Sequence, residues 1–113
     1  MFKREWKLFV EDILESVEKI EEYVKDMTLD DFKQDRKTTD AVVRNFEIIG
    51  EASRYIPDDI KIKFQNVDWK AIAGLRNRIA HEYFGISLAI VWEIIKGELP
   101  ILKEQMKEIS EKG

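Results

Sequence analysis

Apolar residues recur every three or four positions along most of this chain, which is the spacing of amphipathic helices. From Phe2 to Val24 they are separated by Glu, Lys and Asp, and the pattern predicts one long helix. The stretch from Asp26 to Thr39 is mostly polar, so we expect a connection with one helical turn, capped by Thr28. The apolar stripe of the first helix consists of Phe2, Trp6, Phe9, Ile13, Val17, Ile20 and Val24.

A second helix is expected to begin near Thr38, Thr39 or Asp40 and to run to Ile56, before Pro57 stops it. Gly50 in its interior costs about 1 kcal/mol against alanine, which predicts that another helix approaches closely there. Off the core stripe lies a mixed-charge face, either simply solvated or part of a site. The core stripe is Val42, Phe46, Ile49 and Ile56, and the charged face is Arg44, Asn45, Glu47, Glu51 and Arg54.

Three further helices are predicted in the second half of the chain. A short one follows Pro57 and carries Ile60, Ile62 and Phe64. The third long helix runs from Trp69, capped by Asp68, to about Phe84, where Gly85 ends it. Its core positions are Ile72, Leu75 and Ile79. The fourth is capped by Ser87, kinked by Pro100, and carries Leu88, Val91, Trp92, Ile95, Leu99, Leu102, Met106 and Ile109.

No stretch alternates with period two, and no internal repeat is present. The sequence therefore predicts one all-α domain spanning residues 1–113, an up-and-down bundle of four long helices plus one or two short ones.

Composition narrows the chemistry that such a bundle can perform. Apolar residues make up 44% of the chain and charged residues 37%, as in a soluble globular protein, and we expect a cytoplasmic location without a membrane span. With no cysteine and one histidine, thiol chemistry is excluded and a transition-metal site within one chain is not expected. The net charge of −4 means that a polyanion would have to be held by a local patch.

The candidate chemistry lies between Leu75 and Gly85, which includes the one histidine, His81, with Arg76 before it and Tyr83 after it. On one helix Arg76 and His81 are about 140° apart, so they do not share a face. The residues could simply stabilise a helix end, through the dipole and ring packing. Alternatively, an arginine and an imidazole suit RNA cleavage by its own 2′-hydroxyl. One histidine cannot act as base and acid at once, so this alternative requires a symmetric dimer.

The segment Arg76 to Tyr83 resembles the R-x4-H-x-Y signature of HepT-like proteins in the HEPN superfamily. Three further blocks resemble that family in the same order: residues 41–52, 69–74 and 90–95.

This resemblance implies a metal-independent endoribonuclease, the toxin of a type II toxin–antitoxin pair, acting as a homodimer whose motifs meet in a cleft. Arg76 and His81 would be the catalytic pair, with no cofactor. Tyr83 would receive AMP from a cognate minimal nucleotidyltransferase (MNT-type) antitoxin. The substrate would be an RNA such as tRNA or mRNA. Because the chain is acidic overall, its cleft would have to supply the RNA and phosphate contacts, for which Asn77, Arg78 and Arg44 are the candidates.

Two other interpretations remain open at this point. The chain could be a non-catalytic module that binds a nucleotide or docks a nucleotidyltransferase, or it could be a purely structural helical dimer. Cleavage of RNA that depends on His81 separates both from the ribonuclease.

Overall fold

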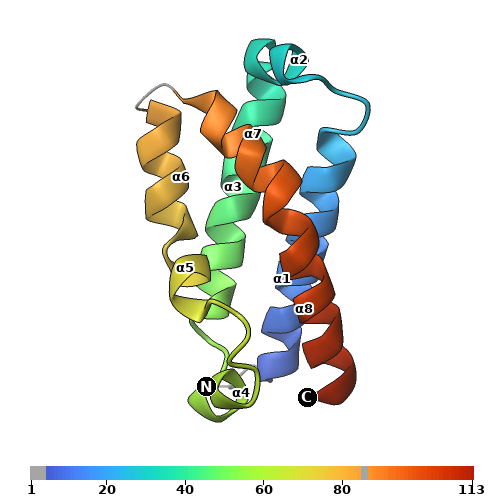
Figure 1. Cartoon of the computed structure of the whole chain (residues 1–113), viewed down its shortest axis with the longest axis vertical. Coiled ribbons are helices and arrows are strands. Elements are labelled where there is room, and N and C mark those ends of the chain that lie inside the picture. The colour runs from blue at the N-terminus through green and yellow to red at the C-terminus, as the bar shows by residue number, and fades with distance from the viewer. Residues whose placement is uncertain (1–4, 85–86) are drawn as a thin grey trace.

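The computed structural model describes residues 5–84 and 87–113, and the side chains of residues 80–84 lie outside that description. The described residues form eight α-helices and no strand, which confirms the all-α prediction (Figure 1). The helices are α1 (Trp6–Tyr23), α2 (Leu29–Gln34), α3 (Arg36–Ser53), α4 (Asp58–Lys63), α5 (Trp69–Ala73), α6 (Leu75–Phe84), α7 (Leu88–Gly97) and α8 (Leu99–Lys112).

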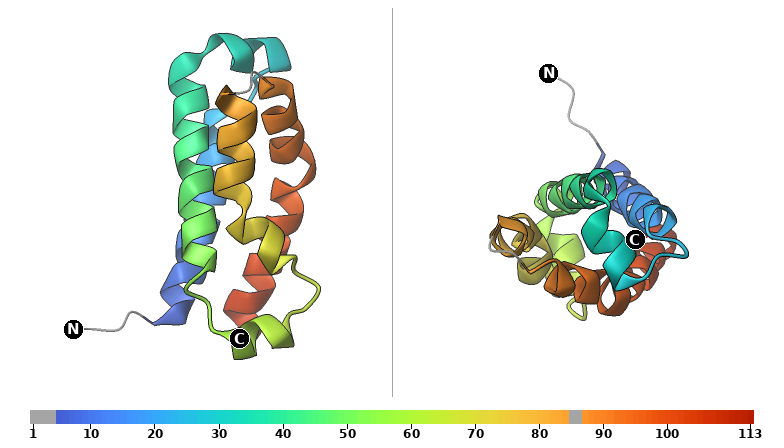
Figure 2. Two further views of the ribbon diagram at one scale, coloured as in Figure 1. Left: turned by 90° about the vertical axis from the view of Figure 1, so that its left-hand side faces the viewer. Right: turned by 90° about the horizontal axis from the view of Figure 1, so that it is seen from above.

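These helices build a bundle of four rods, two of which are interrupted. α1 and α3 are continuous, whereas α5 with α6 and α7 with α8 each form a broken rod (Figure 1). α3 packs between α1 and α6, and α8 packs against the other side of α1 (Figure 2). None of the helices in the described ranges is long and apolar enough to cross a membrane.

The core follows the predicted stripes closely. Val42, Phe46 and Ile49 of α3 are fully buried, and Ile79 of α6 is buried against them in the same cluster. Phe9, which the stripe of the first helix placed in the core, is only half-buried. The other predicted core positions that are buried are Ile13, Val17, Ile20, Val24, Ile56, Ile72, Leu75, Val91, Ile95, Leu99, Leu102, Met106 and Ile109.

The prediction of one continuous helix from Trp69 to Phe84 is wrong, because the helix breaks at Gly74. The break coincides with the close approach expected at Gly50. A Cβ atom at Gly50 would lie 3.3 Å from the carbonyl oxygen of Ile72 and 3.6 Å from the amide nitrogen of Arg76. α3 therefore packs directly against the backbone where α5 ends and α6 begins. The predicted stop at Gly85 lies outside the described residues.

The last rod is also broken rather than kinked. α7 ends at Gly97 and α8 begins at Leu99, with Pro100 in its first turn. A proline there sacrifices no hydrogen bond, because the first amides of a helix have no intrahelical acceptor. Ser87 occupies the N-cap position of α7, but its side chain makes no capping hydrogen bond.

Side-chain caps begin three of the helices, α2, α3 and α5. The capping box of Thr28 with Asp31 is present, and Asp68 caps α5 by accepting from the Ala71 amide at 3.0 Å. The cap of α3 was predicted wrongly. Asp35, rather than a residue at 38–40, accepts from the Thr38 amide at 3.0 Å, and the helix starts at Arg36. α3 also stops at Ser53, three residues short of the predicted end.

Candidate functional site

The motif helix α6 is held by apolar residues on one side and exposes polar residues on the other. Leu75 and Ile79 are buried, whereas Arg76, Asn77 and Arg78 between them are exposed. The backbone of Arg76 lies next to Gly50 of α3, since a Cβ atom at Gly50 would be 3.6 Å from the Arg76 amide nitrogen. The first charged residue of the motif thus lies beside α3.

A surface hollow of about 370 Å³ connects Arg76 with residues of α1 and α3. We call it the α3 hollow. Arg44, a predicted phosphate contact, lines it together with Arg76, so the structure brings these two predicted site residues to one surface. The lining is contributed by Phe9 and Asp12 of α1, by Arg76 of α6, and by Arg44, Glu47, Ile48, Glu51, Ala52 and Tyr55 of α3 and the turn after it.

Acidic residues outnumber basic ones in this hollow. Two guanidinium groups face three carboxylates, and Arg44 already pairs with Glu47 at 3.6 Å between Nη1 and Oε2. Arg76 makes no hydrogen bond or ion pair with any side chain that the structure describes. Arg76 is also exposed, so an incoming anion can reach its guanidinium group.

One wall of the α3 hollow is aromatic, and sequence reasoning missed it. The rings of Phe9 and Tyr55 stack with centroids 4.9 Å apart and an interplanar angle of 19°. Tyr55 is 57% exposed, so much of its surface faces solvent. Its position eleven residues after Arg44 returns to nearly the same face of a helix, and this spacing is the signal that could have placed it here.

Arg78 lies apart from Arg76, on the side of α6 that faces the α7–α8 break. Its Nη1 and Nη2 atoms donate to the two carboxylate oxygens of Glu98, at 3.1 and 2.8 Å. The structure therefore does not bring Arg78 together with Arg44 and Arg76, and its contact with RNA stays a prediction.

The remaining predicted site residues are only partly described. Asn77 is exposed on α6. His81 and Tyr83 belong to α6 by their backbone, but their side chains lie outside the described part of the chain. Asn45, which was assigned to the charged face, is buried instead and donates to the Ala41 carbonyl at 2.9 Å.

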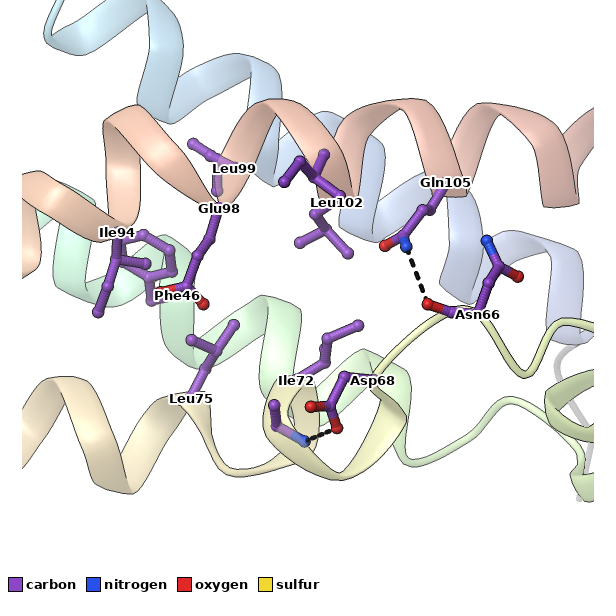
Figure 3. A pocket seen from close by; sticks show the side chains of 12 residues that line it. Phe46, Asn66, Asp68, Ile72, Leu75, Ile94, Glu98, Leu99, Leu102 and Gln105 are labelled. Carbon is purple, nitrogen blue, oxygen red and sulfur yellow. Dashed lines mark hydrogen bonds between the residues drawn. The ribbon is translucent and has the colours of Figure 1, made fainter.

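A second cavity, of about 190 Å³, lies between α5, the start of α6 and the α7–α8 junction (Figure 3). Its walls are largely apolar. Two of its polar residues are already bonded, since Gln105 donates to the Asn66 carbonyl and Asp68 accepts from the Ala71 amide. Glu98 at its edge is paired with Arg78. These bonds leave the cavity poorly equipped for catalysis.

Asp35 and Lys103, two residues that do not line the α3 hollow, have shifted pKa values. The Thr38 backbone amide and hydroxyl lower the pKa of Asp35, and the hydrogen bond to Glu21 raises the pKa of Lys103. Among the described side chains, those of residues 5–79 and 87–113, no cluster of three His, Cys, Asp or Glu residues is arranged to hold a metal ion.

Comparison with known proteins identifies relatives along nearly the whole chain. Residues 13–109 match the family described as "Ribonuclease HepT-like". "Putative RNase MJ1380" of Methanocaldococcus jannaschii is 45% identical over 107 residues, covering 95% of this chain and 98% of the relative. "Probable ribonuclease HepT" of Thermococcus cleftensis is 39% identical, covering 95% of this chain and 97% of the relative. No solved structure matches significantly.

Proposed function

Because this chain belongs to the HepT-like ribonuclease family, we propose that it is a metal-independent endoribonuclease, the toxin of a type II toxin–antitoxin pair. The observation that carries the proposal is the complete Arg76-x4-His81-x-Tyr83 motif on α6, inside the matched residues 13–109. The exposed Arg76, unpaired by any described side chain, adds support, because a phosphate-binding arginine must be reachable.

The chemistry uses the 2′-hydroxyl of the RNA as the nucleophile. A base removes its proton, the 2′-oxygen bonds to phosphorus, and the bond from phosphorus to the 5′-oxygen breaks. An acid then protonates the departing 5′-oxygen, which leaves a cyclic phosphate on one fragment. Arg76 stabilises the negative charge that grows on the phosphoryl oxygens in the transition state.

The two proton transfers require two imidazoles, and each chain has only His81. An imidazole titrates near neutral pH, so one copy can act as base while the other acts as acid. We therefore propose that the active enzyme is a homodimer in which two α6 helices meet across a two-fold axis.

Neutralisation is proposed to occur at Tyr83, two residues after His81. A minimal nucleotidyltransferase antitoxin would transfer AMP from ATP to the phenol oxygen, releasing pyrophosphate. The added phosphate and nucleoside would place bulk and negative charge beside the catalytic pair. Both effects oppose the approach of an RNA backbone.

The deciding experiment incubates the purified protein with total RNA and with tRNA in EDTA, beside His81→Ala. We expect cleavage by the wild-type protein only, with EDTA leaving it unaffected. Equal cleavage by both proteins would refute the assignment, and cleavage abolished by EDTA would refute metal independence.

The acidic lining of the α3 hollow favours a second candidate, a non-catalytic module that docks a nucleotidyltransferase or binds a nucleotide. Three carboxylates beside two guanidiniums suit a protein surface at least as well as an RNA backbone. Nucleotide binding or partner capture that survives His81→Ala, without any RNA cleavage, would establish this candidate.

A further inference from the structure

We propose that the α3 hollow binds one nucleobase of single-stranded RNA, stacked on Tyr55 beside the phosphate that Arg76 holds. This base-binding site rests on the proposed ribonuclease function and specifies its substrate as single-stranded RNA with a guanine next to the contacted phosphate. The site combines an aromatic wall, carboxylate acceptors and an arginine within one hollow.

The aromatic wall supplies the surface for stacking. The Phe9 ring covers part of the Tyr55 ring, with the two centroids 4.9 Å apart. This contact holds the Tyr55 ring while 57% of the residue remains exposed. Proteins bind unpaired bases by stacking them on such rings, because every base presents a π-face. Tyr55 is also fixed through its backbone, since its amide donates to the Ala52 carbonyl at 3.1 Å.

The carboxylates determine which part of a nucleotide the hollow can bind. An excess of carboxylates repels a phosphate, but a neutral base brings N–H donors that carboxylate oxygens accept. Glu51 lines the hollow, is exposed, and makes no ion pair among the described side chains. Guanine presents an imino and an amino N–H side by side, matching both oxygens of one carboxylate, whereas uracil presents one N–H. The hollow is therefore selective for guanine over uracil.

The packing of α3 against α6 links this base site to the motif. The backbone at Gly50 lies against the carbonyl of Ile72 and the amide of Arg76, and Arg76 lines the same hollow as Glu47 and Glu51. A nucleotide could thus place its base on the α3 side and its phosphate at Arg76 without any helix moving.

The test uses fluorescein-labelled 2′-O-methyl oligouridylate with one central guanine, and the same oligonucleotide without guanine. The methyl group blocks the attacking oxygen, so anisotropy measures binding alone. We expect Tyr55→Ala to weaken binding of the guanine probe about tenfold, while Tyr55→Phe stays within about twofold. Glu51→Gln should remove the preference for guanine. Tyr23→Ala, at an exposed tyrosine of α1 outside the hollow, is the matched control.

The outcomes separate this inference from the proposed function. Tyr55-dependent binding without cleavage of natural RNA would support the base site and refute the ribonuclease. Cleavage by the wild-type protein, with equal probe binding by wild-type and Tyr55→Ala, would overturn the base site alone. So would the absence of wild-type probe binding, or a dimer that Tyr55→Ala converts to monomers in light scattering, since the hollow would then face a second copy. If Tyr55→Ala fails to fold, Glu51→Gln decides.

Discussion

Arg78 and Glu98 form a bidentate ion pair that connects the motif helix α6 to the last rod of the bundle. The two terminal guanidinium nitrogens of Arg78 donate to the two carboxylate oxygens of Glu98, at 3.1 and 2.8 Å, although the two residues are twenty positions apart in the chain. Such paired geometry restrains orientation as well as distance. The pair therefore restrains α6 from the side opposite the α3 hollow.

Glu98→Gln should lower the free energy of unfolding by about 0.5–1 kcal/mol, because the side chains are 43% and 52% exposed and solvent weakens the attraction. Urea denaturation at low ionic strength measures the shift in midpoint. The difference should shrink in about 1 M NaCl, where screening is strong. Glu108→Gln, on the exposed side of α8, is the control, and an equal loss there would contradict a specific role for the pair.

Gly50 and Gly97 should respond oppositely to the same substitution. Gly97→Ala adds a methyl group that meets no atom within 4 Å beyond its own helix backbone and chain neighbours, and at this last residue of α7 it should gain up to about 0.5 kcal/mol from helix propensity. Gly50→Ala places its methyl 3.3 Å from a backbone oxygen and should destabilise the protein, and Gly50→Val should cost about 1–3 kcal/mol. Thermal denaturation of the three variants tests this. Stabilisation by Gly50→Ala would contradict the close contact.

The contact at Gly50 illustrates why part of the fold could be predicted from the sequence and part could not. The Thr28 and Asp68 caps depend on residues three positions away, so the local sequence reveals them. The break at Gly74 lies beside Gly50, twenty-four positions earlier, and helical periodicity does not report such a tertiary contact. Asp35 was missed as a cap because several residues that can cap a helix follow it within five positions.

The candidate site, like the fold, could be predicted from the sequence only in part. Arg76 was identified through its motif, and Arg44 through its place on the charged face of α3. Their meeting in one hollow requires the tertiary packing of α6 on α3. Phe9 was assigned to the core because helical periodicity reports the side of a helix but not how completely a neighbour covers it. Tyr55, just past the end of α3, belonged to no predicted stripe.

Arg76→Ala should lower kcat/KM for RNA cleavage by about 10²–10³, the range typical for the loss of one group that stabilises transition-state charge. The melting temperature should stay unchanged, because the side chain is exposed and unpaired among the described residues. Arg54→Ala, an exposed arginine outside the hollow, should retain full activity. Equal losses in both variants would indicate only a general effect of charge.

Co-expression with the cognate nucleotidyltransferase should increase the mass of the protein by one or more AMP units. Tyr83→Phe lacks the phenol oxygen and should show no increase, whereas Tyr23→Phe and Tyr55→Phe should be modified normally. Intact-mass spectrometry makes the comparison. An unchanged increase in Tyr83→Phe would exclude this tyrosine as the site.

The Asp35 cap should make stability depend on pH in the acid range. Its pKa is lowered in the folded protein, chiefly by the Thr38 amide and then by the Thr38 hydroxyl. The contribution is therefore complete above the unfolded pKa, about 3.9, and is lost as pH falls through the lower folded value. Asp35→Asn keeps an acceptor for the amide but does not titrate. Its melting temperature relative to wild type should thus be lowest near neutrality and converge below pH 4, and a constant difference would contradict the assignment.

The few cations in the α3 hollow limit how strongly salt should affect the proposed RNA binding. Each chain has Arg44 and Arg76 there, so a dimer would have four guanidinium groups. Each phosphate neutralised on a single strand releases about 0.7 counterion, which predicts a slope of log affinity against log salt no steeper than about −3. Such an enzyme would hold RNA through base contacts more than through charge, and would keep working at high ionic strength.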